Sequence, residues 1–258
     1  MVLAFDIGNS TAVVGLFRNT TLIKTLRLQN TVSFSQQQLA KTLVGFLQSA
    51  HVQPDEIKGA VISSVVPLKT ALFKKVIRQT VHIIAIVISG STNVGIKIRY
   101  RPPSSLGADR LCHAVAAFEK YGGPCIVVDF GTATTFDVVS GKGEYLGGAI
   151  MSGVDTTARG LAERTAKLPL IPYRFPNKAI GRSTVTSMQS GILFGTIDAV
   201  EGMITRIRRE VGKKSVVIAT GGFSKLIAGK TRMIDTVDQW LVLEGAYRIY
   251  RRRSLKKR

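Results

Sequence analysis

Apolar residues gather in short runs interrupted by turn residues, and two parts of the chain share one pattern. An apolar run over 2–5 ends in Asp6, passes through Gly8 and leads into a second run over 12–17. A matching run over 125–128 ends in Asp129, passes through Gly131 and leads into residues 136–139. This pattern predicts strand, turn and strand in each part, followed by third strands over 22–28 and 145–150. The chain therefore carries an approximate internal repeat.

Helix and strand signals alternate after each of these strand groups. In the first part we expect a helix over 69–80, a buried strand over 82–88 and a helix from about 109 to 120. In the second part we expect a strand over 215–219, a closing helix over 238–251 and, before them, a helix over 184–211. The prediction of that helix is based on apolar residues at helical spacing, namely Val185, Met188, Ile192, Val200, Met203 and Ile207. The order predicts two α/β halves, residues 1–115 and 116–258, facing each other across a cleft.

Composition is that of a folded globular protein, with 258 residues of which 45% are hydrophobic and 20% charged. No segment approaches the roughly 20 apolar residues that span a bilayer, and no basic region precedes the N-terminal apolar run. Cys112 and Cys125 lack metal-ligand spacing, and the histidines His51, His82 and His113 are scattered. We therefore expect a cytoplasmic protein with buried reduced thiols and no membrane partner.

The charge is strongly positive, with 36 Lys and Arg against 16 acidic residues, a net charge of +20 and a pI near 10.4. Such a protein attracts polyanions. The basic residues are spread along the chain except for a dense tail over 248–258, which we interpret as the solvated end of the last helix. Nucleic-acid binding is not expected, because no groove-reading motif accompanies the tail. The alternative, a nucleic-acid-binding or regulatory protein, predicts salt-sensitive polyanion binding without ATP turnover.

The two Asp-x-Gly turns are candidates for phosphate binding. A turn between strands exposes backbone N–H groups in a concave nest that suits anionic oxygens. Neighbouring hydroxyl groups add neutral donors, from Ser10, Thr11, Thr132, Thr134 and Thr135. Asp6 and Asp129 would act through a cation, since Mg²⁺ bridges carboxylates to phosphates. Alternatively both aspartates only cap their turns. Two such turns favour an ATP-dependent small-molecule kinase.

Other nucleotide signatures are absent or incomplete. The run Gly229-Lys230-Thr231 resembles the end of a P-loop, but Ser224 stands where the first glycine belongs. No Gly-x-Gly-x-x-Gly follows a strand, so a dinucleotide-binding fold has no support. Gly221 and Gly222, directly after the expected strand over 215–219, either contact adenine or ribose or simply turn the chain.

Seven motifs together resemble the type III pantothenate kinase family, in the family's order and over essentially the whole chain. They are Asp6-Ile-Gly-Asn-Ser-Thr11, Pro102-Pro-Ser-Ser-Leu-Gly107-Ala-Asp109-Arg110, Asp129-Phe-Gly-Thr-Ala-Thr-Thr135, Gly147-Gly-Ala-Ile150, Arg164-Thr-Ala-Lys-Leu-Pro169, Ile180-Gly181-x-x-Thr184 and Thr220-Gly-Gly222. The resemblance implies the acetate and sugar kinase/Hsp70/actin fold, which is a duplicated RNase H-like architecture around a nucleotide. It also implies ATP-dependent phosphorylation of pantothenate to 4'-phosphopantothenate, the first step of coenzyme A biosynthesis. Family members form homodimers and require Mg²⁺ and a monovalent cation such as K⁺ or NH₄⁺.

The resemblance also implies roles for individual residues. The first ATP phosphate loop would consist of Asp6, Ile7, Gly8, Asn9, Ser10, Thr11, Ala12 and Val13. Thr132 would be the second ATP contact, Asp129 the ligand of the monovalent cation and Asp6 a ligand of Mg²⁺ through water. The positions matching pantothenate-binding residues are Tyr100, Gly107, Ala108, Asp109, Arg110 and Thr184, the last of them reaching across a dimer interface. One departure is Ser152, where the family commonly has proline.

Asp109 corresponds to the family's proposed catalytic base. It lies at the start of an expected helix, whose dipole stabilises negative charge, and from spacing alone it is equally well an N-cap. Arg110 is either a bidentate partner of the pantothenate carboxylate or part of a surface ion pair. Tyr100 either lines the substrate pocket or packs at a strand end. Gly191 and Gly195, one helical turn apart, allow close helix packing within one subunit or at a dimer seam.

Overall fold

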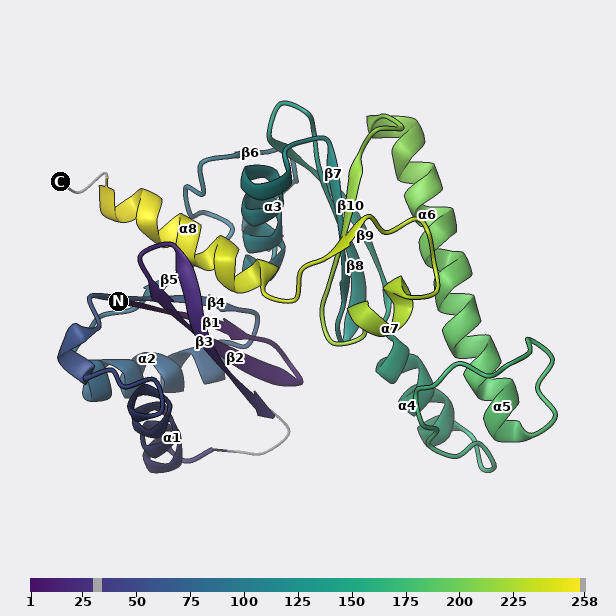
Figure 1. Ribbon diagram of the computed structural model, residues 1–258, viewed down its shortest axis with the longest axis horizontal. Coiled ribbons are helices and arrows are strands. Elements are labelled where there is room, and N and C mark those ends of the chain that lie inside the picture. Colours follow the sequence, from purple (N-terminus) through teal and green to yellow (C-terminus); the bar gives the residue numbers. More distant parts are fainter. Residues whose placement is uncertain (30–33, 256–258) are drawn as a thin grey trace. The chain divides into compact units, whose positions relative to one another are not determined.

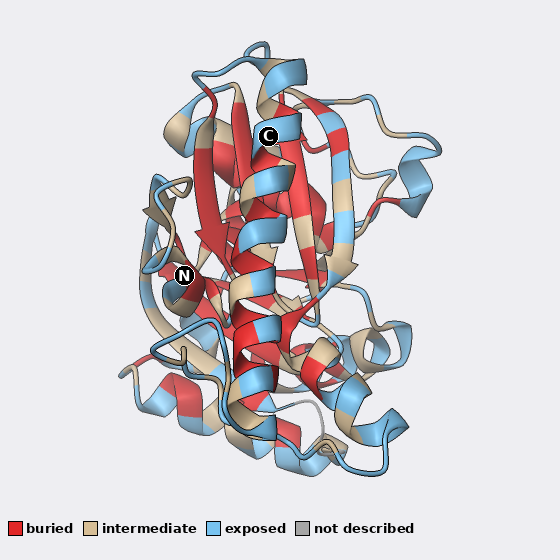
Figure 2. Cartoon of the chain, turned by 90° about the vertical axis from the view of Figure 1, so that its right-hand side faces the viewer, coloured by how far each residue is buried: buried red, intermediate tan, exposed pale blue. Residues whose placement is uncertain are grey.

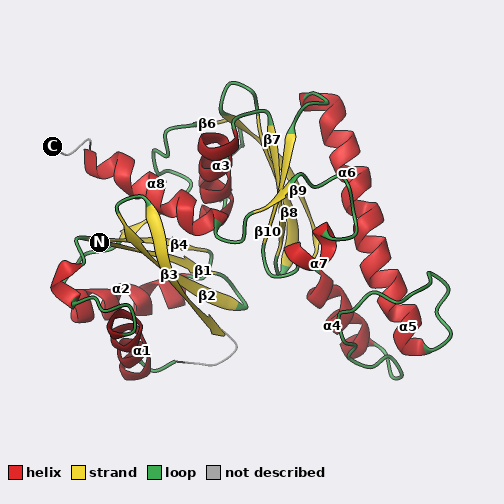
Figure 3. Ribbon diagram, viewed as in Figure 1, coloured by secondary structure: helices red, strands yellow, loops and turns green. Residues whose placement is uncertain are grey.

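The computed structural model describes residues 1–29 and 34–255, so Lys256, Lys257 and Arg258 of the predicted basic tail lie outside the described residues. The chain divides into two compact units. The first consists of Met1–Glu119 and Trp240–Arg258, and the second of Lys120–Gln239. Each unit contains a β-sheet and several helices, so the chain is mixed α/β (Figure 3).

The first unit is built on a five-stranded sheet with the order β3-β2-β1-β4-β5 (Figure 1). The strand β1 pairs antiparallel with β2 and parallel with β4, while β2 and β3 are antiparallel and β4 and β5 parallel. The elements of this unit are β1 (Val2–Ile7), β2 (Thr11–Arg18), β3 (Thr21–Gln29), α1 (Gln36–Gln48), η1 (Pro54–Glu56), β4 (Gly59–Ser64), α2 (Pro67–Val81), β5 (Ile86–Val87), β6 (Lys97–Ile98), η2 (Pro103–Ser105), α3 (Ala108–Tyr121, which ends in the second unit) and α8 (Leu241–Leu255).

The second unit repeats this topology: its own five strands follow the order β9-β8-β7-β10-β11, and the short strand β6 extends the sheet beside β9. Here β7 pairs antiparallel with β8 and parallel with β10, while β8 and β9 are antiparallel and β10 and β11 parallel. Its elements are β7 (Cys125–Phe130), β8 (Ala133–Val139), β9 (Glu144–Ser152), α4 (Val154–Arg164), α5 (Thr184–Gln189), the π-helical turn η3 (Ser190–Phe194), α6 (Gly195–Val211), β10 (Val216–Thr220), α7 (Ser224–Ala228) and β11 (Thr236–Val237). Since the strands correspond one to one in order and direction, the predicted internal repeat is confirmed.

The core of the first unit lies between its sheet and the helices α1 and α2. Helix α1 begins at a capping box in which the Ser35 hydroxyl accepts a hydrogen bond from the Gln38 backbone N–H, while the Gln38 side chain accepts one from the Ser35 N–H. Its buried face then packs on the sheet, and Phe5 of β1 meets Phe73 of α2 edge to face. In Figure 2 the strands are largely buried, whereas the helices alternate between buried and exposed residues, as amphipathic helices do.

The core of the second unit lies on the face of its sheet that carries Val128 and Phe136. Buried residues of α4, η3 and α6 pack against this face, including Ala158, Leu193 and Val200. The predicted helix over 184–211 is confirmed, although it is interrupted by η3, where one turn of the helix is wider than an α-helical turn.

Two details differ from the sequence-based expectations. The predicted strand over 82–88 is wrong over most of its length, because α2 ends at His82 in the left-handed conformation and only Ile86–Val87 pair with β4. The predicted closing helix starts later, at Leu241. It packs on β1, β2 and β4, which places this C-terminal segment in the first compact unit. The predicted division of the repeat at residue 115 stays a prediction.

Among residues 1–29 and 34–255, no helix is both long enough and apolar enough to cross a membrane.

Candidate active site

A backbone hydrogen bond closes the turn after β1. The Gly8 N–H donates to the Thr11 carbonyl at 2.9 Å, so Asn9 and Ser10 stand at the tip of the turn, where both are exposed. The side chains of Ile7, Ala12 and Val13 are buried in the core. These three predicted ATP-binding residues can therefore offer a ligand only their backbone groups, as a phosphate nest requires.

The turn after β7 has the same construction. The Gly131 N–H donates to the Ala133 carbonyl at 3.1 Å and leaves Thr132 exposed at the tip. The Thr132 carbonyl accepts two hydrogen bonds from the start of α4, one from the Gly153 N–H at 3.1 Å and one from the Thr156 hydroxyl at 2.5 Å. The second predicted phosphate turn is thus fastened to a helix.

Asp129 is half-buried near the end of β7. It pairs across the sheet with Thr135 of β8, whose buried hydroxyl forms no hydrogen bond with the residues the structure describes. Gly221 has a left-handed φ of +87°, and a Cβ atom there would lie 2.2 Å from the Asp129 Oδ1. A carboxylate beside an unsatisfied hydroxyl oxygen offers the hard oxygen ligands that a monovalent cation needs, so these residues fit such an ion.

Asp109 lies inside the first turn of α3, which begins at Ala108, and so it is not the residue before the helix. Its Oδ1 accepts a hydrogen bond from the Arg110 N–H at 2.8 Å. A Cβ atom at Gly107 would lie 2.4 Å from the same Oδ1, so glycine is needed for this side-chain position. The carboxylate is half-buried and in an anion-stabilising place at a helix N-terminus.

Asp6 and Asp109 both act electrostatically on the buried thiol of Cys112. Burial raises the pKa of this thiol well above its ordinary value, and the negative charges of Asp6 and then Asp109 raise that pKa further. Two of the predicted site aspartates therefore act on one buried group of the first unit. Cys112 and Cys125 are both buried and free, which confirms the expectation of reduced thiols.

Tyr100 and Arg110, two of the predicted pantothenate-binding residues, also lie together. The Arg110 guanidinium is placed over the Tyr100 ring, 5.8 Å from the ring centroid. Arg110 is only 7% exposed, which excludes its interpretation as part of a surface ion pair.

Thr184 lies in the second unit, exposed at the start of α5, and lines an open groove of about 800 Å³. The floor and walls of this groove come from β9, α4, α5, η3 and α6, and include Leu161, Gly191 and Gly195. Ser152, where the family commonly has proline, lies in the same groove and its hydroxyl accepts a hydrogen bond from Thr157 at 2.9 Å.

Two residues near the predicted site, Thr156 and the fully buried Ser63, were not found from the sequence, and Thr135 was named only as a hydrogen-bond donor. Ser63 pairs with Asp6 across the sheet. Strand register identifies Ser63 and Thr135, and the packing of α4 identifies Thr156; the sequence alone gives neither. Among the described residues, no group of three or more His, Cys, Asp or Glu side chains could hold a metal ion.

Comparison with solved structures defines the class of fold. The activator of 2-hydroxyisocaproyl-CoA dehydratase from Clostridium difficile, with bound ADPNP, superimposes with a TM-score of 0.56 at 13% identity and covers 99% of this chain and 97% of its own. The inorganic polyphosphate/ATP-glucomannokinase from Arthrobacter sp. strain KM superimposes with a TM-score of 0.50 at 12% identity, over 97% of this chain and 98% of its own. Together with the duplicated sheet topology, these similarities give the acetate and sugar kinase/Hsp70/actin fold.

Sequence comparison identifies the family within this class. The family model for type III pantothenate kinase matches residues 2–206. The type III pantothenate kinase of Moorella thermoacetica is 43% identical over 258 residues, covering 98% of this chain and 100% of its own. That of Dehalococcoides mccartyi is 42% identical over 249 residues, or 96% of this chain and 95% of its own. The chain belongs to the type III pantothenate kinase family, and it is a kinase with ATP as the phosphate donor.

Proposed function

We propose that this kinase phosphorylates pantothenate to 4'-phosphopantothenate, the first step of coenzyme A biosynthesis, by direct in-line transfer from ATP. The observation that carries the proposal is that Asp109, in the first turn of α3, and Asp6, of the first phosphate turn, both act electrostatically on the same buried thiol. An acceptor hydroxyl held by Asp109 and a phosphate held at the turn would then belong to one site. The resemblance of the whole chain to pantothenate kinases supplies the acceptor.

Asp109 would orient the primary hydroxyl of pantothenate and take its proton late in the transfer. Its Oδ1 already accepts the Arg110 N–H, so its other oxygen is the one that would accept the hydroxyl. Strong basicity is not needed, because phosphoryl transfer passes through a loose transition state in which positioning and charge neutralisation dominate. Tyr100, Gly107, Ala108 and Arg110 would complete this end of the pantothenate site, with the Arg110 fork on the pantothenate carboxylate.

The two phosphate turns would divide the binding of ATP. The backbone of residues 6–13 would hold one part of the phosphate chain and Thr132 another. Asp6 would hold Mg²⁺ through water, and this ion would neutralise charge on the transferred phosphate. Asp129, with the free hydroxyl of Thr135 beside it, would hold the monovalent cation, K⁺ or NH₄⁺.

The groove that Thr184 lines would be a homodimer interface, with Thr184 reaching the pantothenate site of the partner. Its apolar lining supports this, since contiguous exposed apolar surface marks interaction sites. Gly191 and Gly195 support it further: a Cβ atom on either would meet nothing within 4 Å, so close packing inside this unit does not explain them.

A coupled ADP-release assay tests the proposed function. With ATP, Mg²⁺ and K⁺, we expect ADP release to depend on pantothenate, and to fall at least about tenfold when Na⁺ replaces K⁺. A rate of ADP release that is the same with and without pantothenate would contradict the proposed acceptor. A pantothenate-dependent rate that is the same in Na⁺ would leave the acceptor intact and contradict only the cation assignment.

A further inference from the structure

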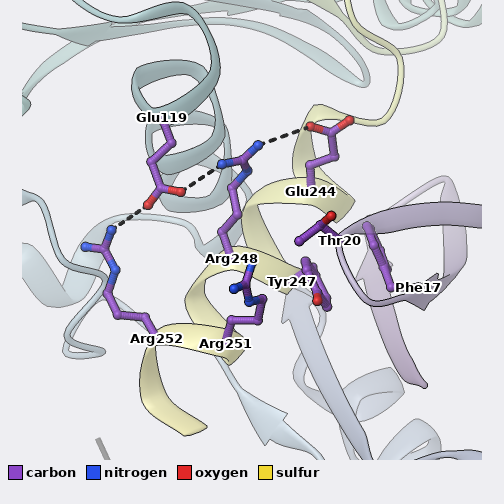
Figure 4. Close-up of a pocket in the computed structure, with 8 residues that line it drawn as sticks. All are labelled: Phe17, Thr20, Glu119, Glu244, Tyr247, Arg248, Arg251 and Arg252. Atoms are coloured by element: carbon purple, nitrogen blue, oxygen red, sulfur yellow. Dashed lines mark hydrogen bonds and ion pairs between the residues drawn. The ribbon is translucent and has the colours of Figure 1, made fainter. Parts of the chain in front are cut away.

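A pocket of about 290 Å³ lies in the first unit between the β2–β3 hairpin and α8, and none of the residues assigned to the kinase site lines it (Figure 4). Its wall is a stacked aromatic pair, Phe17 and Tyr247, whose ring centroids are 4.4 Å apart. The other residues that line it are Thr20, Glu119, Glu244, Arg248, Arg251 and Arg252. Its volume lies at the lower end of the range for small-molecule sites.

Two of the three arginines are held in place by glutamates. Glu119, near the end of α3, accepts from Arg248 at 2.8 Å with one carboxylate oxygen and from Arg252 with the other. Glu244 approaches Arg248 from the opposite side at 4.0 Å. Figure 4 shows Arg248 between the two carboxylates, and both guanidinium groups remain about one-third exposed. The two guanidinium groups are thus fixed in orientation and remain accessible to a ligand.

Arg251 differs from these two arginines. It is exposed, it lines the same pocket, and it forms no hydrogen bond or ion pair with the residues the structure describes. Its positive charge acts on the aromatic wall: burial raises the pKa of the Tyr247 phenol, while the charge of Arg251 lowers it. The Tyr247 hydroxyl is itself used, donating to the Asn19 carbonyl, so the remaining side-chain hydroxyl in the pocket is that of Thr20.

We propose that this pocket is an accessory binding site for a small phosphate-bearing anion, with Arg251 as its principal ligand and Arg248 and Thr20 as further donors. Three guanidinium groups against two carboxylates leave the lining positive. The planar fork of arginine matches the several oxygens of a phosphate, and charge-assisted hydrogen bonds are the strong ones. The site gives part of the excess positive charge a specific role, which does not depend on the proposed pantothenate reaction.

Isothermal titration of the full chain with pyrophosphate, at low ionic strength and without Mg²⁺, tests this proposal. Pyrophosphate can also bind at a nucleotide site. We therefore assign to this pocket only the part of the pyrophosphate binding that is lost when Arg251 is substituted. We expect Arg251→Gln to weaken it about tenfold or more, because one charge-assisted contact is lost. Arg253→Gln is the matched control. It removes the same charge from another exposed residue of the same helix that lies outside the pocket, and we expect a change of less than about twofold.

Glu244→Gln should act in the opposite direction. It removes a negative charge from the lining and should strengthen pyrophosphate binding several-fold, a gain that a misfolded variant cannot produce. Equal effects of Arg251→Gln and Arg253→Gln would overturn the proposal, since they would indicate only the general field of the protein. Weaker binding in Glu244→Gln would also overturn it. A parallel titration with ADP identifies the source of the phosphate. If ADP binds more tightly than pyrophosphate and this binding is lost in Arg251→Gln, the ligand is a nucleotide. If ADP binds more weakly than pyrophosphate, the ligand is an inorganic anion.

Discussion

Glycines shape the positions of two of the predicted site carboxylates. Gly221 lies against Asp129 in the second unit, and Gly107 lies against Asp109 in the first, each so close that a Cβ atom would meet a carboxylate oxygen. These contacts explain why glycine occupies motif positions that hold no reactive group.

Gly221→Ala should therefore impair the cation site. The new Cβ would displace the Asp129 carboxylate, and the left-handed backbone would add about 1–2 kcal/mol of strain. We expect the K⁺ concentration for half-maximal activity to rise about tenfold, and the K⁺-dependent increase in melting temperature to shrink. Gly222→Ala is the control, because a Cβ there meets nothing within 4 Å. If both variants keep the K⁺ response of the unchanged protein, Asp129 is not the cation ligand.

At this scale the sequence identified the charged groups but not their neighbours. Asp6, Asp109 and Asp129 follow from motifs. The strand pairing of Ser63 with Asp6 and of Thr135 with Asp129 follows from register, and the hydrogen bond of Thr156 with the second phosphate turn follows from the packing of α4. Residue spacing also could not decide whether Asp109 is an N-cap or the catalytic base, because spacing does not distinguish a residue before the helix from one inside its first turn.

At the scale of elements, the continuous segment α5–η3–α6 presents one face to the core and another to the groove. Buried residues such as Ile192 and Leu193 anchor it to the sheet. Gly191 and Gly195 carry no side chain, so they leave space on its outer face. A helix face of this kind lets another backbone approach closely.

Gly191→Leu should weaken the proposed homodimer without weakening the fold. The side chain would enter open space in its own unit but occupy the groove that a partner needs, while helix propensity favours leucine by up to about 1 kcal/mol. We expect size-exclusion chromatography with light scattering to show a dimer for the unchanged protein and a monomer for this variant. Gly202→Leu, on the same helix outside the groove and equally without contacts, should stay dimeric. A monomeric parent protein, or a dimeric Gly191→Leu variant, would contradict the assignment.

The long elements were predictable because their apolar spacing is regular, as in α2 and the segment from residue 184 to 211. The run over 82–88 was not, since apolar residues alone cannot show that His82 ends a helix in the left-handed conformation. Helix α1 and strand β4 were not foreseen, although Ser35 and Gln38 form a capping box that could have indicated the helix start.

At the scale of the whole molecule, duplication is the organising feature. The two units repeat one strand order and one turn construction, and each turn carries an aspartate at the end of its first strand. The units nevertheless differ in the groups associated with that aspartate. In the first it is the Cys112 thiol, on which Asp109 also acts electrostatically, and in the second they are Thr135 and Gly221. This divergence supports separate roles for the two turns, with the acceptor chemistry beside the first.

The turnover of an Asp109→Asn enzyme tests the central claim most directly. The variant keeps the size of the side chain but loses the charge that would orient and deprotonate the hydroxyl of pantothenate. We predict a fall in kcat of about 10²–10⁴-fold with pantothenate, an unchanged melting temperature, and no comparable fall for Asp55→Asn, an exposed aspartate in the same unit. A folded Asp109→Asn enzyme with near-normal kcat would contradict the account.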